Sequence, residues 1–169
     1  MKQAVAMMMG AALAAGLVLA GAQTASAEPA HTDSDIGTYT THQVINKTSK
    51  HTYNTGQRLS YCDVSRTGAT CTISKTASAT RSIAVDLGIT RSEVAGSLNI
   101  SASSSVAIAV SCTSPKLNAG ERWSAYPNGT AFTYNVRSTT YRDTGVVISG
   151  PTTSGKLHAF SPDGGIHCQ

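Results

Sequence analysis

The 169-residue chain carries 13 Lys and Arg against 9 Asp and Glu, which gives a formal net charge of +4. Its basic residues are scattered along the sequence, whereas nucleic-acid-binding proteins concentrate them on one face or stripe, so we expect no nucleic-acid partner. After the N-terminal leader, no segment is apolar over the length that a membrane-spanning helix needs.

The first 27 residues have the organisation of a secretory signal peptide. Lys2 supplies positive charge, residues 4–22 form an apolar stretch, and Ala25 and Ala27 match a small-residue cleavage signal. We expect cleavage after Ala27 and a secreted, extracellular protein. The mature chain, residues 28–169, is long enough for one domain with a hydrophobic core.

Residues 28–56 are polar and show no helical period, which predicts an extended arm with an edge strand over 38–46. One interpretation is a disordered leader. The other is an arm that pairs with a strand edge of another secreted protein subunit. In the second case the candidate partner-binding residues are Ile36, Tyr39, Val44 and Ile45.

All four cysteines lie in the exported part, which predicts two disulfides in an oxidising compartment. Three pairings are possible. We favour Cys62–Cys71, because turn-forming residues separate these two cysteines, and Cys112–Cys168, which would fasten the C-terminus to a long strand. The spacing does not fit a zinc site.

Two segments alternate apolar and small polar residues with a period of two, about residues 71–87 and 97–112. This period predicts strands. The short segment 88–96 between them suits a hairpin connection with at most one helical turn. We therefore expect a long antiparallel hairpin of about sixteen residues in each strand.

The rest of the chain is rich in turn signals. "YPNGT" (126–130) predicts a turn, residues 132–136 alternate like a strand, and 146–149 and 156–160 are short strand-like runs. No amphipathic helix of ten residues appears in the mature chain. The predicted fold class is all-β: an antiparallel β-sandwich or elongated sheet, with one disulfide-stabilised domain over 57–169.

The sequence contains no G-x-S-x-G motif or other nucleophile signature, so we expect neither an enzyme nor a cofactor. His158 and His167 near Cys168 do not have the spacing of a metal site, and we expect no metal. Carbohydrate binding by aromatic side chains is an alternative, although in a chain with 5% aromatic residues such side chains are more typical of a core.

The alternating segments "TISKTASATRSIAV" and "LNISASSSVAIAV" resemble the insertion hairpin of aerolysin-type β-pore-forming toxins. This resemblance implies a hairpin that enters a membrane with one lipid-facing side. Lys75 and Arg81 depart from the pattern, because both would fall on the lipid-facing side. Disulfides through Cys71 or Cys112 would also restrain the base of such a hairpin.

Most of the mature chain resembles small secreted actinobacterial proteins with the run "C…SATRSIAVDLG…SEVAGSLNISAS…SCTSPKLNAGERWSAYPNGTAFTYNV…SGKLHAFSP…C". Among these, it is similar to the adaptor subunits of umbrella toxin particles, which link a lectin subunit to a toxin-bearing scaffold. The resemblance implies a non-enzymatic protein of interbacterial competition whose partners are other secreted subunits. A membrane is a partner only if the pore-forming alternative holds.

Overall fold

A computed structural model describes residues 37–169, which belong to one compact unit. The predicted signal peptide and the first part of the predicted arm, including Ile36, lie outside the described residues. Strands dominate, and paired strands are antiparallel throughout, so the predicted all-β class is confirmed.

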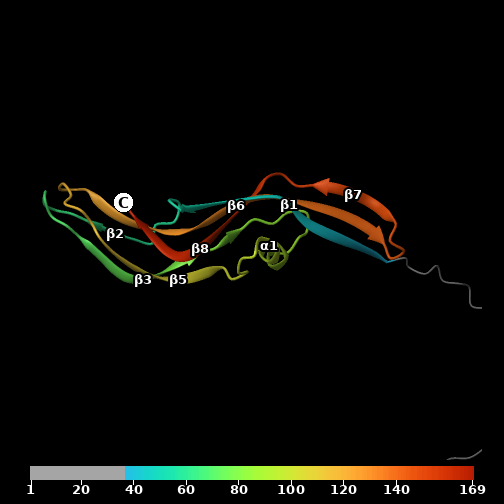
Figure 1. Ribbon diagram of the computed structural model, residues 1–169, viewed down its shortest axis with the longest axis horizontal. Coiled ribbons are helices and arrows are strands. Elements are labelled where there is room, and N and C mark those ends of the chain that lie inside the picture. Colours follow the sequence, from blue (N-terminus) through green and yellow to red (C-terminus); the bar gives the residue numbers. More distant parts are fainter. Residues whose placement is uncertain (1–36) are drawn as a thin grey trace, which may run out of the picture. The chain divides into compact units, whose positions relative to one another are not determined.

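The longest strand, β6 (Arg122–Arg142), is the centre of a six-stranded sheet (Figure 1). Its 21 residues span about 70 Å at ~3.3 Å per residue. Strands β1 and β2 pair with one edge of β6, β7 and β8 pair with the other, and β4 extends the sheet beyond β8. Their bounds are β1 (Thr38–Tyr53), β2 (Ser60–Asp63), β4 (Ser82–Ile83), β7 (Val147–Thr153) and β8 (Leu157–Cys168).

The predicted turn at "YPNGT" is wrong, because Pro127 and Gly129 lie inside β6. The carbonyl of Pro127 accepts a hydrogen bond of 3.0 Å from the N–H of Asn54. The pairing of β6 with β8 shifts its register between Pro127 and Gly129. A Cβ at Gly129 would lie 2.3 Å from the Ser161 carbonyl oxygen, so only glycine allows β8 this close approach.

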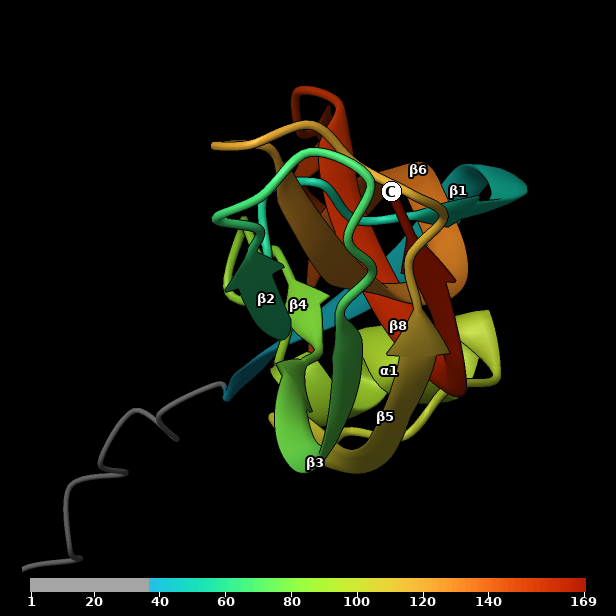
Figure 2. The same ribbon diagram turned by 90° about the vertical axis from the view of Figure 1, so that its left-hand side faces the viewer.

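A second, two-stranded sheet consists of β3 (Thr72–Thr80) and β5 (Ser105–Thr113). Figure 2 shows this pair of strands beside the larger sheet. Alternate residues of both strands are buried and pack with residues of the six-stranded sheet. We call the resulting cluster the hairpin core; its buried members are Leu59, Ile73, Ala79, Ile108, Val110 and Ala125.

The strands of this hairpin are nine residues long, so the prediction of about sixteen is wrong. The alternation after Thr80 does not continue the pairing with β5, because β4 pairs with β8 instead. Arg81, the residue between β3 and β4, is buried. Its guanidinium donates hydrogen bonds to the Ser161 hydroxyl (3.1 Å) and the Ser103 carbonyl (3.1 Å).

One helix, α1 (Arg91–Leu98), occupies most of the predicted hairpin connection. Thr90 is its N-cap and forms a reciprocal capping box with Glu93. Hydrogen bonds from the Thr90 side chain and then its backbone hold the pKa of Glu93 below its ordinary value. Leu98, which the alternation had placed on a strand, is the last residue of this helix.

The helix packs against the sheet face formed by β1, β4, β6 and β8. We call this cluster the helix core; its buried members are Val44, Ile83, Ile89, Val94, Ala95, Leu98, Tyr134, Val136 and Ala159. The Tyr134 hydroxyl donates a hydrogen bond to the Ala84 carbonyl, and burial raises the pKa of this tyrosine.

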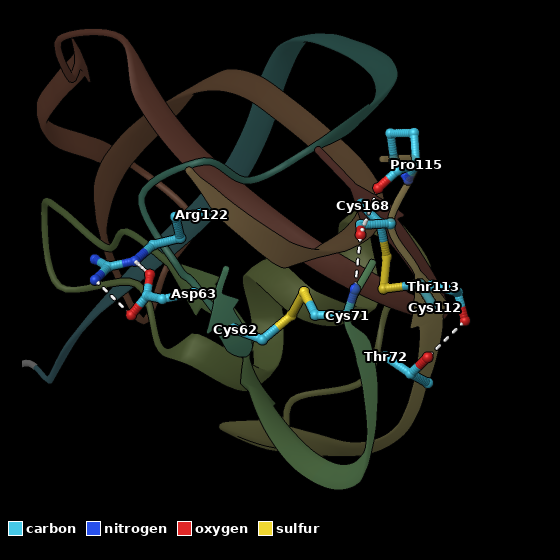
Figure 3. Close-up of a disulfide and its surroundings, with 10 residues drawn as sticks. Cys62, Asp63, Cys71, Thr72, Cys112, Thr113, Pro115, Arg122 and Cys168 are labelled. Carbon is cyan, nitrogen blue, oxygen red and sulfur yellow. Dashed lines mark hydrogen bonds and ion pairs between the residues drawn. A yellow bond between two sulfur atoms is a disulfide. The ribbon is translucent and has the colours of Figure 1, made fainter. Parts of the chain in front are cut away.

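Both favoured disulfides, Cys62–Cys71 and Cys112–Cys168, are confirmed (Figure 3). They join β2 to the start of β3 and β5 to the end of β8. Disulfides of this kind are typical of an oxidising, non-cytoplasmic compartment.

Candidate protein-docking surfaces

The predicted arm is part of the sheet and does not stand apart from it. Strand β1 begins where the expected edge strand begins and extends further, to Tyr53. Because β1 pairs with β6 from Thr38 to Tyr53, the part of the expected arm that the structure describes belongs to the same sheet as β6. In the described part of the chain no strand pairs with the other edge of β1, which is therefore open.

The direction of one hydrogen bond tells which backbone groups face this open edge. The N–H of Asn54 points toward β6, where it donates to the Pro127 carbonyl. Because backbone groups of successive strand residues point to opposite edges, the N–H groups of Tyr53, His51 and Ser49 point away from β6. These groups can bond to an added strand without any loss of the β1–β6 pairing.

Side chains fasten β1 to its neighbours on the paired side. Hydroxyl pairs join Thr40 to Thr140 (3.0 Å) and Thr48 to Thr133 (2.7 Å). The Tyr53 ring stacks on the His167 ring of β8, with 3.8 Å between ring centroids. The paired edge of β1 is thus fixed by side-chain contacts as well as by backbone hydrogen bonds.

His51 reaches across β6 to Asp163 of β8, with 2.7 Å between Nε2 and Oδ2. Partial burial acts to raise the pKa of Asp163, but hydrogen bonds from the Gly165 N–H and from His51 outweigh it and hold that pKa below its ordinary value. Asp163 lies within β8, at a bulge opposite β6 residues 127–129.

The open edge carries positive charge and no carboxylate. Lys47 and Lys50 lie on β1, which contains no Asp or Glu. The Lys47 ammonium donates a hydrogen bond of 3.1 Å to the Ser97 carbonyl at the end of α1. A bulge between Ile45 and Thr48, with Asn46 in the left-handed region (φ 53°), interrupts the edge. Lysine and bulges both protect an edge strand from random association.

The predicted partner-binding residues do not form one surface. Tyr39 is 45% exposed and stacks on Tyr141 of β6. Val44, one of the predicted partner-binding residues, is only 8% exposed and belongs to the helix core, so its side chain is not available to a partner in this fold. Ile45 is half-buried beside the bulge, and Ile36 lies outside the described residues.

An apolar surface that the sequence analysis missed lies where β1, β6 and β7 extend past α1 (Figure 1). Val146, Val147 and Ile148 are 58%, 50% and 45% exposed. Tyr39, Tyr141 and Val147 are cross-strand partners, so their side chains share one face of the sheet. The signal in the sequence was the run of three consecutive apolar residues, because a strand with one exposed face normally alternates apolar and polar residues.

At the other end of β6, an exposed tyrosine lies between two arginines. The guanidinium carbons of Arg58 and Arg122 lie 4.7 Å and 4.3 Å from the centroid of the Tyr61 ring. Arg122 also forms a bidentate ion pair with Asp63 beside the Cys62–Cys71 disulfide (Figure 3). The hydrogen bond from Arg122 lowers the pKa of Asp63.

Within residues 37–169, no group of three or more His, Cys, Asp or Glu side chains is arranged to hold a metal ion. A groove of about 270 Å³ crosses β1, β6, β8 and β4, and it is lined in part by Tyr53, His158 and Phe160. Ligand pockets for small molecules are usually larger, about 300–1,000 Å³. Two aromatic side chains of the sheet, Tyr134 and Phe160, are buried.

In the same part of the chain, no helix has the length and apolar character to cross a membrane. The features that remain for function are the open edge of β1, the apolar surface around Val147 and the arginine–tyrosine cluster at Tyr61. Comparison of the chain with protein-family models and with curated proteins finds no match to either.

Proposed function

We propose that this chain is a secreted, non-enzymatic adaptor that links a lectin-like subunit to a scaffold in an extracellular antibacterial toxin particle. The observation that carries the proposal is the open edge of β1, which offers sixteen residues of strand to a partner. The resemblance to adaptor subunits of umbrella toxin particles supplies the identity of the partners.

Docking on this edge is by strand addition. An extended segment of the partner bonds to the outward N–H and C=O groups of residues such as Ser49 and His51, and extends the sheet beyond β1. The cationic side chains of Lys47 and Lys50 favour a segment that carries Asp or Glu, because opposite charges on neighbouring strands stabilise their pairing.

An adaptor needs a second surface for its second partner. The arginine–tyrosine cluster at Tyr61 supports this role because it lies further along β6 than the docking residues: Ser49 pairs with Phe132, whereas Tyr61 pairs with Ser124. Tyrosine and arginine are the residue types that contribute most often to binding energy at protein interfaces.

The pore-forming alternative draws less support from the same geometry. The residues that would face lipid, such as Ile108 and Val110, are buried in the hairpin core. The start of β3 and the end of β5 are each bonded by a disulfide to another strand. The segment that connects the other two ends contains α1, which contributes to the helix core. Insertion would require both cores to open.

The test compares a backbone variant with its matched control. Ser49→Pro removes an outward N–H that the β1–β6 pairing does not use, whereas Ser49→Ala keeps it. Each tagged protein is incubated with culture supernatant of the producing bacterium, and captured proteins are identified by mass spectrometry. We expect Ser49→Ala to capture a lectin-like subunit and a scaffold subunit, and Ser49→Pro to lose one of the two.

A second variant deletes residues 28–36 and leaves all of β1 in place. A longer deletion, of residues 28–50, would not test docking separately from folding, because it removes Val44 from the helix core together with most of β1. The adaptor function is rejected if the unchanged protein captures no secreted subunit. Docking on β1 is rejected if Ser49→Pro captures the same subunits as Ser49→Ala.

A further inference from the structure

The outer edge of β7 has the composition of a strand that pairs with its own copy. Residues 144–153 contain no charged side chain, and Val146, Val147 and Ile148 are all about half exposed. Natural edge strands are usually protected by lysine, by inward-facing charge or by a covering segment. In the described part of the chain, β7 pairs only with β6. Pro151 and the register shifts opposite β6 residues 138–141 interrupt it, but its apolar run 146–148 has no lysine, no inward-facing charge and no covering segment.

The directions of the backbone N–H and C=O groups show which residue of β7 can pair with an added strand. The carbonyl of Val146 points toward β6, where it accepts a hydrogen bond of 2.8 Å from the N–H of Arg142. Successive residues of a strand alternate in direction, so the C=O and N–H of Val147 point away from β6. Val147 therefore presents a free donor and a free acceptor at the middle of the apolar run.

We propose that the protein forms a two-fold symmetric dimer in which β7 pairs with β7 of a second copy, centred on Val147. In this antiparallel register Val147 faces its own equivalent and exchanges two backbone hydrogen bonds with it. Val146 of each copy then faces Ile148 of the other. The strand is thus complementary to itself at every apolar position.

The dimer also joins the apolar faces of the two copies. Tyr39, Tyr141 and Val147 form one cross-strand row, in which the two tyrosine rings stack with centroids 5.3 Å apart. Pairing through β7 places the two rows end to end on one continuous sheet. The exposed area of each Val147 side chain is covered by the equivalent valine, a β-branched pair of the kind that stabilises sheets.

The charge pattern permits self-pairing at the β7 edge and opposes it at the β1 edge. Self-pairing of β7 brings no like charges onto adjacent strands, because residues 144–153 are uncharged. Self-pairing of β1 would set two copies of Lys47 and Lys50 against one another. Pro151 has no N–H, which limits the β7 pairing to about residues 146–149 and leaves a small, concentration-dependent interface.

The test measures the mass of the oxidised secreted protein by sedimentation velocity from about 1 to about 200 µM. We expect the mass to rise toward twice that of the monomer over this range. Val147→Lys places two ammonium groups face to face and weakens the dimer at least about tenfold. Val85→Lys is the matched control, since Val85 is also 50% exposed but lies outside the strands, and it dimerises like the unchanged protein.

Val147→Pro is the second variant. It removes only the outward N–H, so the far-ultraviolet circular dichroism stays unchanged while the dimer weakens. The inference is overturned if the unchanged protein is a monomer at every concentration. It is equally overturned if the Val147→Lys and Val147→Pro variants, folded by circular dichroism, dimerise at the same concentration as the Val85→Lys control.

Discussion

The two disulfides should contribute unequally to stability, because they close loops of different length. Cys112–Cys168 spans 56 residues and Cys62–Cys71 spans 9. Closing a loop lowers the entropy of the unfolded chain by an amount that grows with the logarithm of its length. This relation gives about 4.2 kcal/mol for the longer loop and about 2.6 kcal/mol for the shorter one at 25 °C.

Replacing both members of one pair by alanine isolates each contribution. In both pairs the cysteines are half-buried. The loss of packing is therefore similar, and the difference of about 1.6 kcal/mol comes from the loops. With a slope of about 1.5 kcal/mol per molar urea, the unfolding midpoint falls by about 2.8 M without Cys112–Cys168 and about 1.7 M without Cys62–Cys71.

The assay is equilibrium unfolding in urea, followed by the fluorescence of Trp123, the only tryptophan. Treatment of the unchanged protein with a reductant serves as a control and should destabilise it at least as much as either double variant. Equal shifts for the two double variants, or a larger shift for the Cys62 and Cys71 pair, would refute the loop-length argument.

Three further predictions concern the cores, the helix cap and the His51–Asp163 contact. Ile108→Ala, at a side chain only 1% exposed, should lower the free energy of unfolding by about 2–5 kcal/mol, whereas Val85→Ala at an exposed site should change it by less than about 0.5 kcal/mol in the same urea titration. Thr90→Ala should cost about 1 kcal/mol through loss of the capping box. Because folding lowers the pKa of Asp163 from 3.8, its stabilising contribution is present above that value and is lost as the pH falls through the folded pKa. Asp163→Asn should therefore flatten the acid side of the stability–pH curve; an unchanged slope below pH 3.8 would contradict this.

The local features of the fold could be predicted from the sequence. Turn-forming residues between Cys62 and Cys71 pointed to their disulfide, and the strand predicted over about 97–112 includes most of β5 (Ser105–Thr113). These signals depend on residues close together in the chain. The predicted strand began too early, at residues that include Leu98 and Ile100. Alternation among small residues is a weaker signal for a strand than the capping box of Thr90 and Glu93 is for a helix.

Long-range pairing could not be predicted in the same way. The β1 sequence is polar on both faces over much of its length, so its alternation does not reveal that it pairs with β6. Likewise the sequence around Pro127 is typical of a turn, but in the structure Pro127 lies within β6. On one side of it the partner strand changes from β1 to β2, and on the other side the pairing with β8 shifts its register. The docking surfaces depend on these pairings, which explains why Val44 was assigned to a partner surface and Val147 was missed.

The antiparallel arrangement around β6 has a mechanical consequence. β1 begins at one end of β6 and the chain ends near the other (Figure 1). Thr38 pairs with Arg142, whereas Cys168 pairs with Ala125 and is bonded to Cys112. A force that pulls the start of β1 and the end of β8 apart acts parallel to these strands. The load is then shared by many hydrogen bonds at once and does not open them one after another, so the molecule should resist stretching between two tethered neighbours far better than peeling from one edge.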